Sequence, residues 1–195
     1  ANPEAADKYW LTSLMRAAAD KDTTLLKMLL EHQVARPLIN IDHQNANGSA
    51  AIHQAAITDQ VKAAQLLFEA KAKLDLEDKL GQTPLAAAAA HGSVNVLKFL
   101  VSILGTEAAN SQGDTPLLVA ASGSKLAALD FLISAGANLN HQNQYGCTAL
   151  HLASQQDHVT VVKTLLKAKA NIEIRNSEDK TALCVAVAVD NRSVE

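Results

Sequence analysis

A short apolar motif recurs at a nearly constant interval along this chain of 195 residues. Its third position holds Leu or Ile every time, and successive copies are 38, 33, 32, 33 and 33 residues apart. The six apolar residues are Leu14, Ile52, Leu85, Leu117, Leu150 and Leu183. A period of this length indicates stacked supersecondary units, each of which buries its apolar surface only against its neighbours.

Each unit contains two segments with helical spacing. After Leu85, for example, small residues follow at Ala88 and Ala89, which places all three side chains on one helical face. A second segment of larger apolar residues follows about ten residues later, as at 99–101. Aromatic residues make up only 3% of the chain, so the hydrophobic residues are mostly Ala, Leu and Val. We therefore expect a short inner helix and a longer outer helix in each unit.

Turn residues stand just before the motif. A glycine precedes the first motif residue by two positions in four units, where a tight turn needs positive φ. These glycines are Gly48, Gly81, Gly113 and Gly146. Thr83-Pro84 and Thr115-Pro116 then supply a helix N-cap and a proline suited to the first helical turn. Each inner helix is therefore expected to begin directly after a tight turn.

Two stretches, residues 78–85 (DKLGQTPL) and 143–153 (NQYGCTALHLA), resemble the ankyrin repeat pattern, as does 136–140 (GANLN). The resemblance covers nearly the whole chain from about Asp7 onward. It implies an all-α solenoid, a stack of ankyrin repeats with short β-hairpin turns. The hairpin tips and the inner helices of such a stack line its concave face.

The resemblance divides the chain into one domain, residues 1–195, with six repeats. The repeats are expected at about 7–40, 41–77, 78–109, 110–142, 143–175 and, in part, 176–195. Trp10 and Asp179 stand where other repeats have glycine, and Ala50 stands in place of the capping Thr. Loss of that cap is expected to cost about 1 kcal/mol. The last repeat has no room for an outer helix, so we expect a continuation of the chain or another element to cover this end.

Composition and charge argue against several function classes. The net charge is −3 and no long run of Lys or Arg occurs, so nucleic acid is not an expected partner. The most apolar stretch, residues 85–104, is interrupted by polar residues such as His91, Asn95 and Lys98, so membrane insertion is not expected. Cys147 and Cys184 are too few to form a disulfide framework. We expect an intracellular protein, cytoplasmic in the first instance, with the nucleus or a host cell as alternatives.

No combination of residues indicates catalysis, a cofactor or a metal ion. The chain has no HExxH, GxSxG, Walker-type or CxxC motif. His53 and His151 occupy a slot that ankyrin repeats use for turn hydrogen bonds. His43 and His141 are three repeats apart, too far to share a metal ion whose ligand bonds are about 2 Å long. We therefore predict a protein that is not an enzyme.

The resemblance also indicates where a partner would bind. In this family, recognition residues lie in the tips, just after the small pair of the inner helix, and at the repeat junctions. The corresponding residues here are Ile57, Leu80, Gln82, His91, Gln112, Asp114, Tyr145, Gln155, Gln156 and Arg175. Leu80 and Tyr145 have an alternative interpretation, in which they only pack between neighbouring tips.

Two functions remain open. The first is a module that binds a protein or peptide through the concave face, because a full set of repeats occurs without catalytic motifs. The second is the substrate-recruiting or targeting domain of a larger enzyme or effector, whose catalytic part would lie outside this chain. The incomplete last repeat motivates the second hypothesis.

Overall fold

The computed structural model describes residues 12–35 and 39–190, and this part of the chain contains eleven helices and no strand. The inner helices are α1 (Ser13–Ala19), α3 (Ala51–Ile57), α5 (Pro84–His91), α7 (Pro116–Ser122), α9 (Ala149–Gln155) and α11 (Ala182–Asp190). The outer helices are α2 (Thr24–Ala35), α4 (Val61–Glu69), α6 (Val94–Leu104), α8 (Leu126–Ser134) and α10 (Val159–Lys167). The predicted all-α repeat stack is confirmed. Trp10 lies outside the described residues.

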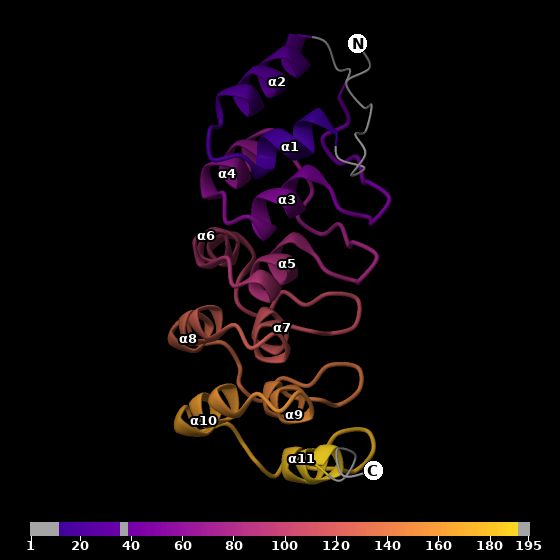
Figure 1. Ribbon diagram of the computed structural model, residues 1–195, viewed down its shortest axis with the longest axis vertical. Helices are drawn as coiled ribbons and strands as arrows, with labels where there is room; N and C mark the ends of the chain where they lie inside the picture. The colour runs from indigo at the N-terminus through magenta and orange to yellow at the C-terminus, as the bar shows by residue number, and fades with distance from the viewer. Residues whose placement is uncertain (1–11, 36–38, 191–195) are drawn as a thin grey trace.

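The helices form an elongated stack (Figure 1). In that view the outer helices α4, α6, α8 and α10 form a column at the left and α2 lies at the top, the inner helices lie in the middle, and the connecting tips project to the right. Each of the first five inner helices packs against its own outer helix and against the inner helix of the next unit. α11 packs against α9, and no outer helix accompanies it in the described part of the chain.

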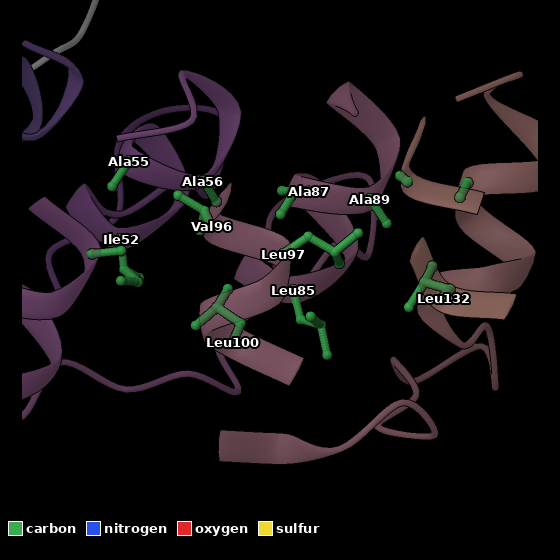
Figure 2. Close-up of a cluster of buried hydrophobic side chains, with 14 of the residues drawn as sticks. Ile52, Ala55, Ala56, Leu85, Ala87, Ala89, Val96, Leu97, Leu100 and Leu132 are labelled. Carbon is green, nitrogen blue, oxygen red and sulfur yellow. The ribbon is translucent and has the colours of Figure 1, made fainter. Parts of the chain in front are cut away.

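Small side chains hold the inner helices together. Ala55, Ala56 and Ala87 are completely buried where α3 meets α5 (Figure 2). Ala at these positions lets two helix backbones approach closely, as the sequence indicates. Larger residues from the outer helices, such as Leu97 and Leu132, complete the core with no exposed surface. Burying a leucine side chain of this kind contributes about 1.5–3 kcal/mol.

The helix starts follow the sequence in most units. The Thr83 hydroxyl accepts a hydrogen bond from the Ala86 N–H at 3.2 Å, and Pro84 occupies the first helical position. Thr148 caps α9 in the same way. Thr115 does not confirm the prediction, because its buried hydroxyl makes no hydrogen bond with the described residues. Nothing in the structure explains this exception. Ala50 lacks a side-chain cap, as expected.

Candidate functional site

The five tips that lie within the described residues share one hydrogen-bond pattern. In the fifth unit, Asn143 Oδ1 accepts hydrogen bonds from the backbone N–H groups of Tyr145 and Cys147, both at 3.0 Å. The same pair of bonds is made by Asn45, Asp78, Asn110 and Asn176. Short Asn and Asp side chains favour such turns because they can bond to their own backbone. The turns are closed without forming strands, and they hold the residue at the middle of each tip in a fixed place.

Neighbouring tips are joined through their backbones. The N–H of Ser177 donates to the carbonyl oxygen of Tyr145 at 3.0 Å, and Gln144 donates to Gln112 at 3.1 Å. Between the third and fourth units this bond is replaced, because the carboxylate of Glu77 accepts from the N–H and hydroxyl of Ser111. The Leu80 side chain is 73% exposed and that of Tyr145 is 62% exposed. The contacts between tips therefore leave both side chains open to solvent.

Two buried histidines connect inner helices to the next tip. Nδ1 of His53 accepts from the Ala50 N–H at 3.2 Å, so Nε2 carries the proton and donates to the Gln82 carbonyl at 3.1 Å. Burial lowers the pKa of His53, which favours this neutral form. His151 bridges Thr148 and the carbonyl of Lys180 in the same way. These contacts agree with the structural role that the sequence indicates.

A groove with a volume of 490 Å³ lies between the last three tips and the helices α9 and α11. The tip residues Gln112, Tyr145 and Glu178 contribute to its wall, and Leu152 and Val185 give it an apolar floor. Four of the ten residues expected to bind a partner lie along it. They are Gln112, Asp114, Tyr145 and Gln155.

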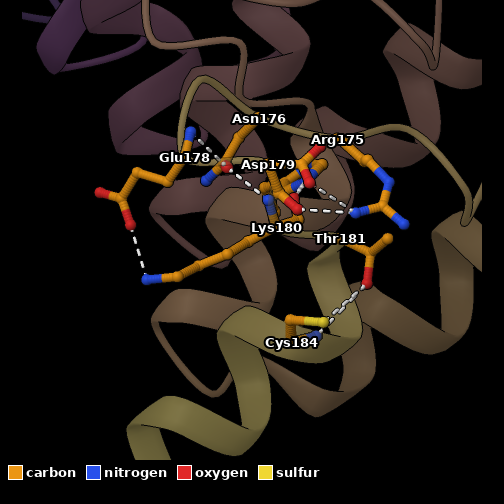
Figure 3. Close-up of polar contacts among 8 residues, drawn as sticks. Arg175, Asn176, Glu178, Asp179, Lys180, Thr181 and Cys184 are labelled. Carbon is orange, nitrogen blue, oxygen red and sulfur yellow. Dashed lines mark hydrogen bonds and ion pairs between the residues drawn. The ribbon is translucent and has the colours of Figure 1, made fainter.

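The charges along this groove are unevenly paired. Lys180 Nζ lies 2.6 Å from a carboxylate oxygen of Glu178, so these two side chains form an ion pair (Figure 3). Asp114 is half-buried, and its Oδ1 accepts a hydrogen bond from Asn143 Nδ2 at 2.7 Å. Burial raises the pKa of the Cys147 thiol, and the negative charges of Asp114 and Glu178 raise it further. Among the charged side chains that line the groove, Asp114 is the one without an ion pair in the described part of the chain.

The other six expected residues lie outside the groove. Ile57 is half-buried and packs against the core, and Gln82 is half-buried with its carbonyl bonded to His53. His91 is the exposed last residue of α5, and its Nδ1 lies 3.0 Å from the Ala87 carbonyl oxygen. Arg175 pairs with Asp179 at 3.0 Å, which leaves its guanidinium partly engaged (Figure 3). The remaining two, Leu80 and Gln156, are exposed.

Several groove residues were not predicted. Asn176 could have been found, because an Asn or Asp begins every tip at intervals of 33, 32, 33 and 33 residues from Asn45. Val185 and Lys180 could not, because they reach the groove only through the packing of α11 and its tip against α9.

Over the part of the chain that the structure describes, no group of three or more His, Cys, Asp or Glu side chains is placed to hold a metal ion. None of the described helices is long and apolar enough to cross a membrane. Cys147 and Cys184 both carry free thiols.

Stacked helical pairs with all tips on one side define a helical-repeat protein of the solenoid class. A family model described as ankyrin repeats, in three copies, matches residues 14–108, 70–143 and 117–194. The chain belongs to the ankyrin repeat family. Repeats of this family generally act as protein–protein interaction modules.

Curated relatives share short stretches of this chain. A mouse protein named protein fem-1 homolog A-like is 28% identical over 101 residues, which is 52% of this chain and 14% of the relative. Human B-cell lymphoma 3 protein is 31% identical over 97 residues, covering 49% of this chain and 21% of the relative. Mouse protein phosphatase 1 regulatory subunit 27 is 30% identical over 76 residues, covering 38% of this chain and 49% of the relative. The chain thus matches half or less of each relative's length.

Proposed function

We propose that this chain binds a partner protein or peptide through the concave face of its repeat stack, with the groove of the last three tips as the main contact. The groove carries the proposal, because it gathers Gln112, Asp114, Tyr145 and Gln155 beside an apolar floor. Exposed Leu80 would extend the contact toward the third unit. Tyrosine is among the residues that most often supply the binding energy of an interface, so Tyr145 is the expected main contact residue.

The proposed role is binding without catalysis. Every histidine described in the groove region has a structural hydrogen bond, since His151 bridges a cap to the next tip and His141 bonds to the Gly113 carbonyl at 2.9 Å. A general acid or base would need to face a substrate with its ring nitrogen available. The expected ligand is a protein or peptide, and neither nucleic acid nor a membrane.

The test is affinity capture from a lysate of the source cell with wild type and with the double variant Leu80→Ala, Tyr145→Ala. A partner held through the tips is expected to be captured by wild type and lost from this variant. The matched control is Leu25→Ala, Leu166→Ala, which removes two exposed leucines from the outer helices α2 and α10. Circular dichroism would verify that both variants fold. Equal capture by wild type and the tip variant would place the binding surface elsewhere.

A second function is recruitment of a substrate or target for a larger enzyme or effector. Two observations favour it: this chain spans 14% to 49% of the relatives described above, and one of them is by name a regulatory subunit of a phosphatase. An antibody against this chain would measure the mass of the natural protein in its source cell. A product near 20.6 kDa would contradict this second function.

We also infer an intracellular location, in the cytoplasm, the nucleus or a host cell. The inference is supported by the free thiols of Cys147 and Cys184, since thiols stay reduced in those compartments. Fractionation of the source cell with the same antibody tests it. Recovery of the protein from the secreted fraction alone would refute it.

A further inference from the structure

We propose that the groove takes an arginine side chain of an extended partner segment, with the guanidinium on the Asp114 carboxylate and its plane against the Tyr145 ring. The proposal rests on the proposed function and adds the chemistry of the partner to it.

Asp114 supplies a carboxylate with room for a cation. One oxygen is occupied by Asn143 Nδ2 at 2.7 Å, and among the described residues no Lys or Arg forms an ion pair with this side chain. The side chain is half-buried, so an ion pair formed here is screened by water less than one on an open surface. A carboxylate has about four acceptor positions, and a single hydrogen bond leaves most of them open.

Tyr145 supplies an aromatic surface at the same place. Asn143 connects the two groups, because its Nδ2 donates to Asp114 and its Oδ1 accepts from the Tyr145 N–H at 3.0 Å. One carboxamide therefore fixes the carboxylate and the tyrosine backbone relative to each other. The Tyr145 side chain remains 62% exposed beside the groove. A tight turn that holds a large aromatic residue in solvent leaves its ring free to stack.

Arginine fits this pair better than other side chains do. Its planar guanidinium pairs with a carboxylate through parallel N–H bonds and also stacks on an aromatic ring. Lysine offers a compact charge without the planar group. The other charges of the groove are also consistent with an arginine at this place. Glu178 and Lys180 neutralise each other, so Asp114 is left as the groove charge without an ion pair.

The arrangement of the tips indicates an extended partner. The groove wall includes the middle residues of three successive tips, Gln112, Tyr145 and Glu178. Packed helices lie about 8–10 Å apart, so three tips cover roughly 16–20 Å. An extended chain rises about 3.3 Å per residue and would cover that length in about five or six residues. The apolar floor at Leu152 and Val185 would receive a neighbouring apolar side chain.

The test uses the full chain and a phage-displayed library of random dodecapeptides as the probe. Selected peptides are synthesised with each arginine kept or replaced by citrulline, a neutral side chain of the same shape, and affinities are measured by fluorescence anisotropy. We expect citrulline at one position to weaken binding by about tenfold or more, as for loss of a charged hydrogen-bond partner. Asp114→Asn should weaken the arginine peptide similarly and remove most of the difference between the two peptides.

Two further variants separate a direct contact from a general loss of folding. Asp130→Asn removes one negative charge from the exposed face of α8 and should leave affinity unchanged. Tyr145→Phe should keep the affinity, whereas Tyr145→Leu should lower it, because only the first keeps an aromatic face. Selected peptides whose affinity is indifferent to citrulline and to Asp114→Asn would overturn the inference.

Thiol protection distinguishes that failure from failure of the proposed function. A peptide in the groove should protect Cys147 from iodoacetamide, while Cys184, which is exposed and not part of the groove wall, serves as the internal reference. Protection of Cys147 by peptides that do not depend on arginine would overturn only the arginine assignment. Selected peptides that leave Cys147 unprotected would overturn the groove as the binding site, and the arginine assignment with it.

Discussion

Asp59 lies in the turn after α3 and caps a helix of the next unit. Its Oδ1 accepts hydrogen bonds from the N–H groups of Asn95 and Val96 in α6, each at 2.9 Å, and its Oδ2 accepts from Asn95 Nδ2 at 2.7 Å. Ser93, the residue before α6, makes no side-chain cap. A carboxylate from one unit therefore satisfies the exposed N–H groups at a helix start in another.

Asp157 provides a matched control for this residue. It occupies the equivalent turn, with φ of 54° against 57° for Asp59, and its carboxylate has no hydrogen bond within the described residues. Asp59→Ala should cost about 0.5–2 kcal/mol more than Asp157→Ala, the usual worth of a cap, because the backbone strain of alanine is the same at both sites. Urea unfolding measures both losses. Equal losses would show that the three bonds contribute nothing to stability.

Each tip depends on a residue with positive φ. Gly146 has φ of 68°, and in the last tip Asp179 adopts φ of 57° at the corresponding position. A Cβ on Gly146 would lie 2.8 Å from the Ser177 nitrogen, because the two tips approach closely to form the Tyr145–Ser177 backbone bond. The glycine is required for its conformation and for the space it leaves. At Gly136, with φ of 83°, a Cβ would meet no atom within 4 Å.

This difference predicts unequal costs for two glycine substitutions. Gly136→Ala should lower the free energy of unfolding by about 1–2 kcal/mol, which is the strain of an alanine in the left-handed conformation. Gly146→Ala should lower the free energy of unfolding by a further 0.5–1.5 kcal/mol or so. This is the net contribution of the Tyr145–Ser177 backbone bond, which breaks when the new Cβ pushes the tips apart. Thermal unfolding of both variants gives the comparison. If Gly146→Ala destabilised the chain less than Gly136→Ala, the close approach of the two tips at Gly146 would be contradicted.

At the scale of the whole molecule, stability depends on position along the stack. Leu117 and Leu183 occupy the same slot of their units, yet Leu117 is completely buried and Leu183 is 73% exposed. The reason is that α7 is packed between α5 and α9, whereas α11 has an inner helix on one side only in the described part of the chain. A leucine in this slot is therefore part of the packed core in the middle of the stack and a surface residue at its end.

Truncation of these two leucines should differ strongly. Leu117→Ala should destabilise the chain by about 2–5 kcal/mol, as for other leucines removed from a packed core. Leu183→Ala should change stability by no more than about 0.5 kcal/mol, as exposed substitutions usually do. Guanidinium unfolding followed by circular dichroism measures both. Similar losses would mean that another element covers α11.

The sequence predicted the parts of the fold that depend on local and periodic patterns. The interval between Leu85, Leu117 and Leu150 predicted the stack, and the alanine pairs predicted inner helices in close contact. The predicted side-chain cap is confirmed at Thr83 and is also present at Thr148. It is absent at Thr115, whose hydroxyl is buried without a partner among the described residues.

The candidate site was predicted only in part. The slot pattern identified Gln112, Asp114, Tyr145 and Gln155, which line one groove, but it gave equal weight to Ile57 and Gln82, which are half-buried. A repeat pattern assigns a residue to a slot of its unit. It does not state whether the next unit covers that slot, or which side chains occupy the space between the two.

The sequence by itself determined the repeat, the helix pairs and the turns, because periodic apolar residues, glycines and caps act within about one unit of chain. The tertiary structure alone decided that Asn143 joins Asp114 to Tyr145, that Asp59 caps α6, and that Val185 forms part of a groove floor. These contacts join residues of different units, and their geometry follows from how closely the units pack.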